Sequence, residues 1–255
     1  MATTSPSLAF DLSAAKAALA AKDERIARLI EETLEFQLKM EAMDSPYESL
    51  MRSIAYQSIS GKAAATIFAR VKALGSNGNA PTPQEMLKLR KPVLRKAGLS
   101  GTKILAMKDL AQKTIDGVVP TMEQALKMSD EELVERLVSV RGIGAWTVEM
   151  FLIFRLGRPD VLPVHDLGVK KGWCVVYGKK RMPRPKELLA FGERWRPYRT
   201  LASWYMWRAF ERAGYKATNK ISKALVRKKR AKAAAKVVAV KLKKKSVASR
   251  RKVRG

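Results

Sequence analysis

Few residues of this chain could do chemistry, and the most prominent is a carboxylate in a polar loop. Asp166 follows Pro163 in the segment Leu-Pro-Val-His-Asp-Leu-Gly-Val, residues 162–169, and stands beside His165, the one histidine of the chain. A loop carboxylate can stabilise a developing positive charge, and it can also cap the helix that follows. Spacing alone favours the cap, so this loop does not by itself assign a reaction.

The single cysteine of the chain excludes several kinds of disulfide, metal and cluster site. One cysteine, Cys174, rules out intrachain disulfides, a cysteine-rich zinc site and a four-cysteine iron–sulfur cluster. We expect Cys174 to be a small buried apolar residue. No apolar run approaches the length of a membrane span, and the first ten residues lack the layout of a signal peptide.

A second informative segment joins two apolar helical patterns through a glycine hairpin. Gly142 and Gly144 flank Ile143, so the backbone can adopt positive φ there, and Ile143 would fill the space between the two helices. The second helix, residues 145–156, would then point its free N–H groups at a ligand beyond the hairpin. A DNA phosphate suits that position, but a tight turn between two helices fits the pattern equally well.

The charge of the chain is large and unevenly placed. The 255 residues carry 51 Lys and Arg against 23 Asp and Glu, a net charge of +28, which indicates a polyanionic partner. Residues 216–255 hold 17 of the basic residues, no acidic residue and no aromatic one. Such a segment cannot bury a core, so we expect a disordered tail that contacts nucleic acid without sequence preference. The simpler alternative is a solvated tail that only aids solubility.

Hydrophobic spacing predicts an all-α domain over residues 1–215, followed by the basic tail, 216–255. Ser129 and Glu132 form an expected capping box that opens a helix over residues 130–138. Residues 174–177 are the only short strand candidate. The other expected helical segments are residues 12–33, 47–74, 84–89, 92–97, 102–117, 122–128 and 145–156.

Besides the hairpin, four separated segments resemble one known family in the order in which that family has them. They are residues 47–64, the Ala-Gly-Leu-Ser-Gly-Thr-Lys turn at 97–103, the Asp166 loop, and Trp-Arg-Pro-Tyr-Arg at 195–199 running on to Trp207. The chain resembles the helix-hairpin-helix DNA glycosylases, specifically the 3-methyladenine DNA glycosylase II branch, over most of residues 12–212. The resemblance implies two helical subdomains with a DNA-binding cleft between them.

The resemblance also implies a reaction, the hydrolysis of the N-glycosidic bond of a damaged base. Asp166 matches the catalytic aspartate of the family, which stabilises the oxocarbenium-like sugar and helps to orient the attacking water. His165 matches no catalytic position and is interpreted as a neighbour. An alkylated purine such as 3-methyladenine or 7-methylguanine is cationic, so electron-rich rings can select it. Trp146 and Trp207 match pocket positions, and Met150, one turn after Trp146, is expected to form a third wall of the pocket.

The tryptophan at position 146 decides between two reaction types within the resemblance. Bifunctional members hold a lysine there, which attacks the sugar and leads to strand nicking. A tryptophan has no amine, so the resemblance implies a monofunctional enzyme that leaves an abasic site. We interpret Trp173 and Trp204 as core residues.

The target base must leave the duplex, and family members fill the gap with a side chain from a probing loop. Ser58 falls at that wedge position, with Gln57 and Ser60 beside it. Serine is shorter than the wedge we would expect, and a serine at a helix N-terminus is an equally good reading.

The hairpin residues Arg141, Gly142, Ile143 and Gly144 match the family's phosphate-binding turn. That turn usually holds a monovalent cation through backbone carbonyls, here those of Val138, Val140 and Ile143. The resemblance thus implies a structural K⁺ or Na⁺, no required cofactor and no iron–sulfur cluster.

Three functions remain open at this point. The first is an alkylbase DNA glycosylase that starts base excision repair, and the second is a non-catalytic protein that binds and compacts DNA. The third is the same fold acting on deaminated or oxidised purines. For the enzyme we expect a monomer that acts on double-stranded DNA and not at a membrane. We expect it inside the cell with the DNA, in the bacterial cytoplasm and nucleoid or in a nucleus.

Overall fold

The computed structural model of this chain describes residues 8–33, 36, 38, 40, 45–76 and 79–214. These residues form α-helices and the short 3-10 helix η2, and they contain no strand. The helices are α1 (Leu12–Lys22), α2 (Glu24–Glu32), α3 (Pro46–Tyr56), α4 (Gly61–Lys72), α5 (Pro83–Lys88), α6 (Lys91–Lys96), α7 (Gly101–Ile115), α8 (Met122–Lys127), α9 (Asp130–Val138), α10 (Ala145–Phe154), α11 (Leu167–Val176), α12 (Pro185–Gly192), η2 (Glu193–Trp195) and α13 (Arg199–Arg212). The all-α prediction is confirmed.

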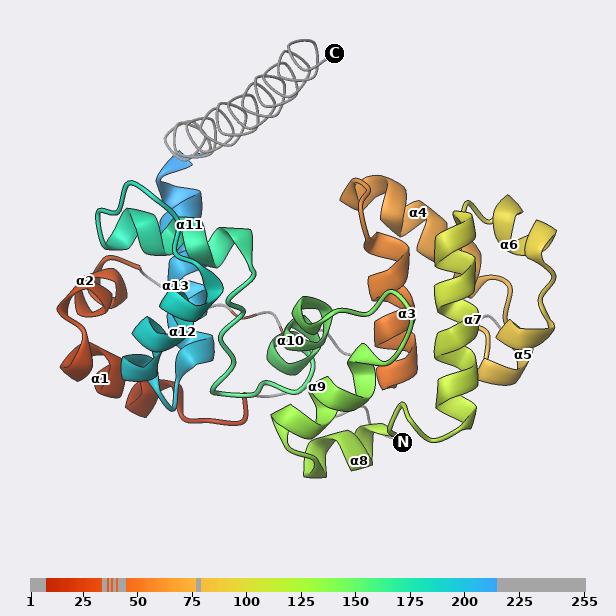
Figure 1. The fold of residues 1–255 in the computed structure, drawn as a ribbon, viewed down its shortest axis with the longest axis horizontal. Coiled ribbons are helices and arrows are strands. Elements are labelled where there is room, and N and C mark those ends of the chain that lie inside the picture. Colours follow the sequence, from red (N-terminus) through yellow and green to blue (C-terminus); the bar gives the residue numbers. More distant parts are fainter. Residues whose placement is uncertain are drawn as a thin grey trace, which may run out of the picture.

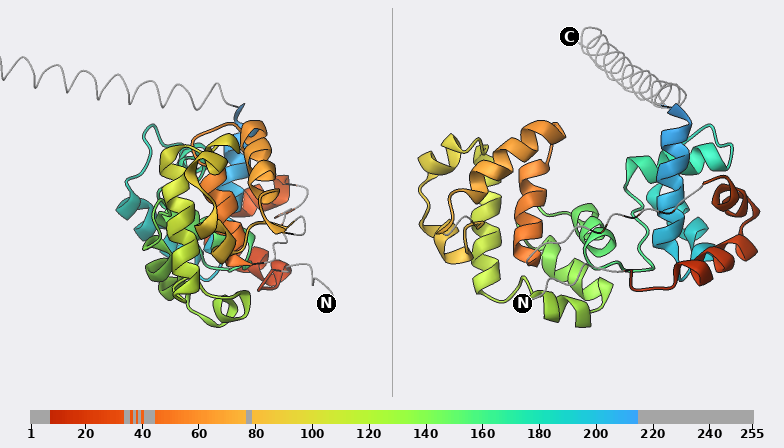
Figure 2. Two further views of the ribbon diagram at one scale, coloured as in Figure 1. Left: turned by 90° about the vertical axis from the view of Figure 1, so that its right-hand side faces the viewer. Right: turned by 180° about the vertical axis from the view of Figure 1, so that it is seen from behind.

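The helices form two lobes, each around its own core, as the two-subdomain prediction expects (Figure 1). The first lobe contains α3 to α10, and its core includes the fully buried Leu50 and Leu110. The second lobe joins α1 and α2 to the distant α11, α12, η2 and α13, around Leu19, Trp195 and Tyr205. The view from behind shows the same division (Figure 2). Helix α10 belongs to the first lobe and α11 to the second. The residues between these two helices therefore lie where the lobes meet.

Within the second lobe, α11 packs chiefly on α13. A Cβ on Gly172 of α11 would lie 1.9 Å from the carbonyl oxygen of Met206 in α13. Only glycine therefore allows this close approach of the two helices. The contact holds the middle of α11 against α13, and α11 begins directly after Asp166, a residue of the site described below.

Two expectations about elements are wrong. Residues 12–33 form two helices, because Asp23 is extended between them and caps α2 by accepting hydrogen bonds from the N–H groups of Arg25 and Ile26. The Tyr177 hydroxyl and Nε1 of Trp195 donate hydrogen bonds to Oδ2 of Asp23. Contacts with distant residues therefore fix the break between α1 and α2. Residues 174–176 end helix α11 and form no strand, because their β-branched valines complete a helix that packs on α13.

Most other boundaries agree with the sequence to within two residues. Helix α9 spans Asp130–Val138 as predicted, with Ser129 as its cap; Glu132 pairs with Arg136 instead of completing the capping box. Residues 47–74 hold α3 and α4, separated by the loop that the resemblance implies. The predicted domain limit at 215 and the basic tail, 216–255, lie outside the described residues. Within the described part, no helix is long and apolar enough to cross a bilayer.

Candidate active site and DNA interface

Asp166 caps a helix, as one interpretation of its loop expects, and its carboxylate also faces two tryptophans. Its Oδ1 accepts a hydrogen bond from the backbone N–H of Val169, 2.7 Å away, at the start of α11. The same oxygen accepts from Nε1 of Trp207 at 2.8 Å, and Oδ2 accepts from Nε1 of Trp146, also at 2.8 Å. All three partners are donors, which suits an acceptor-only carboxylate and fixes its orientation.

Two of the predicted pocket residues, Trp146 and Trp207, meet at this carboxylate from two helices. Trp146 and Met150 lie one turn apart on α10, and Trp207 lies on α13. Trp146 is 46% exposed, unusual for a tryptophan that only packs a core, whereas Met150 and Trp207 are half-buried. Phe154, one further turn along α10, stacks on Trp207 with ring centroids 5.7 Å apart.

The other tryptophans, the histidine and the cysteine lie outside this group of contacts. Trp204 is buried in the second core, as is Trp195, and Trp173 is partly buried against it. His165 is exposed beside Asp166. Cys174 is buried and free, as expected.

The glycine hairpin connects α9 to α10. Gly142 has φ +78°, a conformation that favours glycine, and Gly144 is the N-cap of α10 with no side chain to cap it. Ile143 is only 4% exposed and fills the gap between the helices, as predicted. The first N–H groups of α10 are therefore left for a ligand, and Arg141 is exposed beside them.

Helix α7 anchors the hairpin through two side chains that the sequence did not single out. The Asp109 carboxylate accepts a 2.7 Å hydrogen bond from the Arg141 N–H, and Lys113 donates to the Ser139 carbonyl. Lys113 also lies 3.4 Å from Asp109. Asp109 and Lys113 are four residues apart, so the sequence could have indicated that they lie on the same face of a helix.

The probing loop lies between α3 and α4 and touches the hairpin. Ser58 is exposed with φ +60°, the only described residue other than glycine in that conformation, so it is not the helix N-terminal serine of the alternative reading. Ser60 fills that role, because its hydroxyl accepts from the N–H of Ala63 in α4. Gln57 donates from Nε2 to the Gly142 carbonyl at 2.8 Å.

Replacing Gln57 with alanine should loosen the loop without disturbing either core, because it removes the hydrogen bond from the Gln57 side chain to the Gly142 carbonyl of the hairpin. A bond of this kind contributes about 1 kcal/mol, so we expect about a fivefold loss of affinity for damaged duplex DNA. Fluorescence anisotropy measures it, with Gln112→Ala as the control, because Gln112 is exposed on α7 and its side chain donates to Asp116. Equal affinities for Gln57→Ala and the wild type would show that the contact does not support DNA binding.

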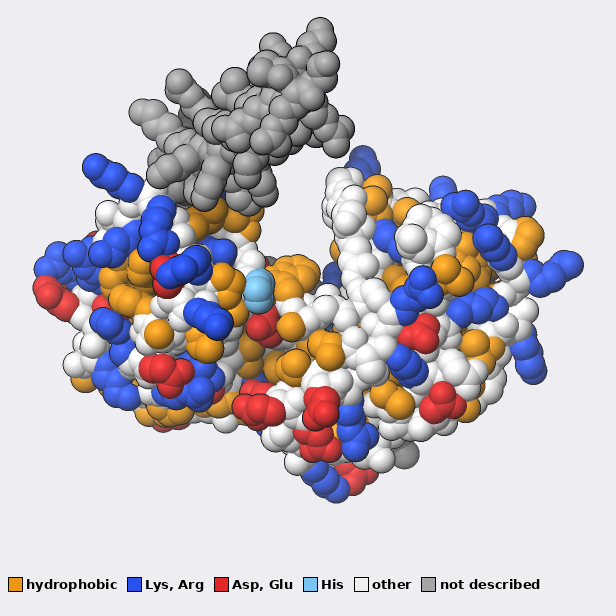
Figure 3. All heavy atoms as spheres, viewed as in Figure 1, with side chains coloured by type: hydrophobic (Ala, Val, Ile, Leu, Met, Phe, Trp, Pro, Cys, Tyr) orange, Lys and Arg blue, Asp and Glu red, His pale blue; other side chains and the backbone are white. Residues whose placement is uncertain are grey.

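The loop, the hairpin and the Gly-Leu-Ser turn line one surface hollow of about 530 Å³. Besides Gln57, Ser58, Arg141 and Gly142, the polar groups of Ser100, Thr102 and Lys103 contribute to it. The space-filling view shows the molecule hollowed between the lobes, with the single histidine on the wall of the second lobe (Figure 3). Four of the predicted DNA contacts, Gln57, Ser58, Arg141 and Gly142, therefore lie on one connected surface.

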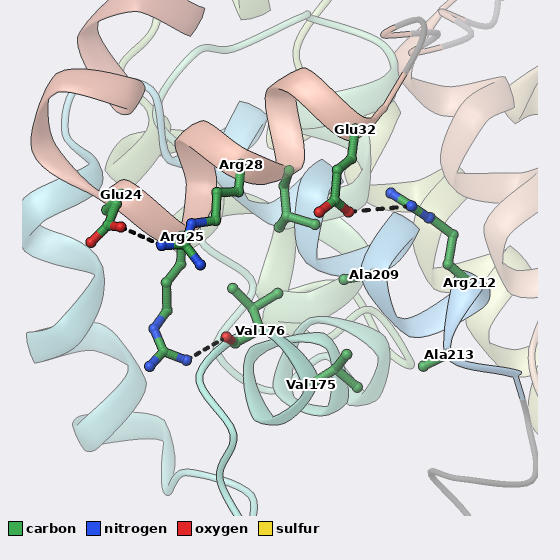
Figure 4. A pocket seen from close by; sticks show the side chains of 10 residues that line it. Glu24, Arg25, Arg28, Glu32, Val175, Val176, Ala209, Arg212 and Ala213 are labelled. Atoms are coloured by element: carbon green, nitrogen blue, oxygen red, sulfur yellow. Dashed lines mark hydrogen bonds and ion pairs between the residues drawn. The ribbon is translucent and has the colours of Figure 1, made fainter.

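A different pocket, of about 610 Å³, contains none of the predicted site residues. It lies between α2 and the ends of α11 and α13, and arginines surround its apolar floor (Figure 4). Arg25 donates to the Val176 carbonyl, and Arg28 and Arg212 pair with Glu24 and Glu32. Because each arginine has a partner, this pocket does not resemble an anion site.

The comparison with protein families decides the classification of this fold. Residues 51–197, which include the loop, the hairpin and Asp166, match the family described as "HhH-GPD superfamily base excision DNA repair protein". The chain belongs to the HhH-GPD superfamily.

Individual HhH-GPD relatives agree with this assignment. DNA-3-methyladenine glycosylase 1 of Schizosaccharomyces pombe is 42% identical over 170 residues, which cover 67% of this chain and 75% of the relative. The solved structure of the 3-methyladenine DNA glycosylase Mag1 of the same organism, in complex with abasic DNA, superposes with a TM-score of 0.69. It is 39% identical and covers 76% of this chain and 95% of its own. A 3-methyladenine DNA glycosidase structure from Bacillus halodurans is 34% identical, with a TM-score of 0.69, and covers 78% of this chain and 89% of its own.

The hairpin of this HhH-GPD chain offers oxygen ligands of the kind that monovalent cations accept. The carbonyls of Ser139 and Gly142 are already taken by Lys113 and Gln57, and neither belongs to the predicted set. The Val140 carbonyl accepts the Ile143 N–H at 3.0 Å, which leaves it a second lone pair. A K⁺ or Na⁺ held by the carbonyls of Val138, Val140 and Ile143 stays a prediction. No side-chain cluster of the described residues fits a metal ion.

Proposed function

We propose that this chain is a monofunctional DNA glycosylase that removes alkylated purines from double-stranded DNA and so starts base excision repair. The observation that carries the proposal is the Asp166 carboxylate, fixed between the indole N–H groups of Trp146 and Trp207 where the two lobes meet. A protein that only binds DNA has no use for a carboxylate oriented in this way, because it would repel the phosphates. The names of the S. pombe relatives support the same substrate class.

The reaction breaks the bond between C1′ of the sugar and the purine nitrogen. The base leaves with the bonding electrons, so an alkylated, cationic purine departs neutral and needs no proton. Positive charge develops on the sugar, and Asp166 supplies a fixed negative charge for it. Water then adds to C1′ and loses a proton. Asp166 Oδ1 accepts two hydrogen bonds but Oδ2 only one, so Oδ2 retains a lone pair that can orient this water.

Selection of the base would come from the aromatic surface beside the carboxylate. The exposed face of Trp146 and the Trp207–Phe154 stack offer electron-rich rings, which attract a cationic base more than a neutral one. Met150 supplies an adaptable apolar wall. Deaminated or oxidised purines remain the second substrate class to be tested.

The wedge and phosphate contacts of the proposal involve the loop and the hairpin. Ser58, at the exposed tip of the loop, would enter the space left by the flipped base, with Gln57 and Ser60 holding the loop. The N-terminus of α10 at Gly144 would bind a phosphate of the damaged strand, and a hairpin cation would add to the same contact. Since Trp146 has no amine, the sugar is released as an abasic site with an intact strand.

The proposal is tested by base release from methylated genomic DNA, with the freed bases separated by chromatography. We expect 3-methyladenine in the supernatant, alkali-labile sites in the DNA, and no covalent adduct after borohydride treatment. A borohydride-trapped adduct would contradict the monofunctional mechanism. Tight DNA binding without release of alkylated, deaminated or oxidised bases would favour the DNA-compacting alternative.

Removing residues 216–255 should weaken DNA binding and reduce its salt dependence while sparing the chemistry. The deletion removes 17 basic residues, and each lost phosphate contact lowers the slope of log K against log salt by about 0.9. Titrations at several salt concentrations compare the two proteins, with base release from short duplexes at low salt as the control. An identical slope for both proteins would contradict a role of the tail in DNA binding.

We further propose that the enzyme acts as a monomer. As a DNA repair enzyme it would be placed with the DNA, in the bacterial cytoplasm and nucleoid or in a nucleus.

A further inference from the structure

Helix α10 carries a second carboxyl group close to Asp166. Glu149 lies three residues after Trp146, so it is on the neighbouring turn of the helix whose first turn donates to Asp166. Its Oε2 atom is buried and has no hydrogen-bond partner. Burial and, second, the negative charge of Asp166 raise the pKa of Glu149 to about 7. A buried carboxyl oxygen with no donor costs free energy, and a perturbed carboxyl so close to the site is a candidate for a functional role.

The surroundings of Glu149 do not neutralise it. It lines a surface groove of about 470 Å³ with three acidic side chains of α9, namely Asp130, Glu131 and Glu135. Asp160 and two arginines, Arg196 and Arg199, complete the charged groups of the groove. Both arginines form ion pairs with Asp160, at 2.5 and 2.7 Å. Of these groups and Asp166, only the charge of Asp166 contributes to the raised pKa of Glu149.

We propose that Glu149 is a positioning residue of the glycosylase reaction: its ionised carboxylate acts through Asp166 by adding negative potential at the sugar, and its protonated form withholds that potential. This inference rests on the proposed function. Two carboxyl groups then serve the site in different ways. Asp166 faces the reacting atoms, and the charge state of Glu149 sets how strongly the site stabilises a cation.

The direction of the pH effect follows from the chemistry. Charge that develops on the sugar is positive, and a nearby second negative charge stabilises it, more so in a partly buried site than in water. Glu149 is protonated below its pKa and ionised above it. Base release should therefore rise with pH between about 6 and 8, around the pKa of Glu149, which lies at about 7.

Single-turnover release of 3-methyladenine from methylated DNA, measured from pH 5.5 to 9, tests the role. This substrate is suitable because alkylation fixes its positive charge. We expect the wild-type rate to rise about fivefold, which corresponds to about 1 kcal/mol of transition-state stabilisation. Glu149→Gln should stay at the low rate throughout, and Glu149→Asp should keep a step. Glu135→Gln, which removes an exposed charge from the same groove, should follow the wild type.

Two results would overturn the role. One is a Glu149→Gln variant, shown by thermal unfolding to be folded, that retains the step. The other is the loss of the step in Glu135→Gln as well, which would make it an effect of net charge.

A second measurement does not depend on activity. Carbon NMR of the carboxyl groups identifies Glu149 by the signal missing in Glu149→Gln, and its titration midpoint should fall in Asp166→Asn. An unmoved midpoint would overturn the coupling. A wild type that releases no base at any pH would overturn the proposed function, and with it the role of Glu149 in a reaction, while the NMR titration would still decide the coupling.

Discussion

Asp166→Asn should abolish base release while DNA binding persists. The amide removes the negative charge that faces the sugar, and a preorganised electrostatic group of this kind contributes at least about a hundredfold in rate. The substitution also disturbs the hydrogen bonds. The amide replaces one carboxylate oxygen with an NH₂ group, so the indole N–H of either Trp146 or Trp207, each now 2.8 Å from an oxygen, would face a second donor.

Single-turnover base release and anisotropy with a duplex that contains an abasic site measure the two halves of this expectation. His165→Gln is the matched control, because His165 is exposed in the same loop and makes none of these contacts. It should release base at a rate within about twofold of the wild type, as surface substitutions generally leave the site intact. An Asp166→Asn protein that retains more than a tenth of the wild-type rate would contradict the assignment of the carboxylate.

The elements that could be predicted from the sequence are those whose signals are local. Ser129 and the apolar spacing after it predict α9 at its observed bounds, and the two glycines of the hairpin predict the turn into α10. Such signals fail where tertiary packing decides. The break at Asp23 depends on Tyr177 and Trp195, more than 150 residues further along the chain. No periodicity within residues 12–33 could have indicated it.

In the candidate site, too, the residue identities could be predicted from the sequence, whereas the contacts between them depend on tertiary packing. The resemblance identified Asp166, Trp146 and Trp207, but the hydrogen bonds among them need the packing of α11 on α13 and the stacking of Phe154 in α10 on Trp207 in α13. Phe154 continues the spacing of Trp146 and Met150, so that spacing was a usable signal. No sequence signal marks Glu149. Its pKa is raised by burial and by the neighbouring charge of Asp166, and neither cause can be inferred from its position in the chain.

Gly168 is the residue whose importance only the structure reveals, and its replacement by alanine should slow base release about tenfold. A Cβ at this position would lie 2.7 Å from Cδ1 of Trp207 and 3.1 Å from Oδ1 of Asp166. Trp207 is stacked on Phe154, so it cannot yield freely, and its hydrogen bond to Asp166 must lengthen or bend. A displacement of about 1 Å in a catalytic group can cost as much as a hundredfold in rate.

Gly101→Ala provides the control for this substitution. Gly101 also lies in the first turn of its helix, and a Cβ there meets no atom within 4 Å. We expect Gly101→Ala to keep the wild-type rate and Gly168→Ala to lose rate at saturating enzyme with unchanged affinity for abasic DNA. That split separates a displaced carboxylate from a damaged DNA interface, because the interface residues of the loop and hairpin lie on other elements. A Gly168→Ala enzyme as fast as the wild type would mean that the Trp207–Asp166 contact does not set the rate.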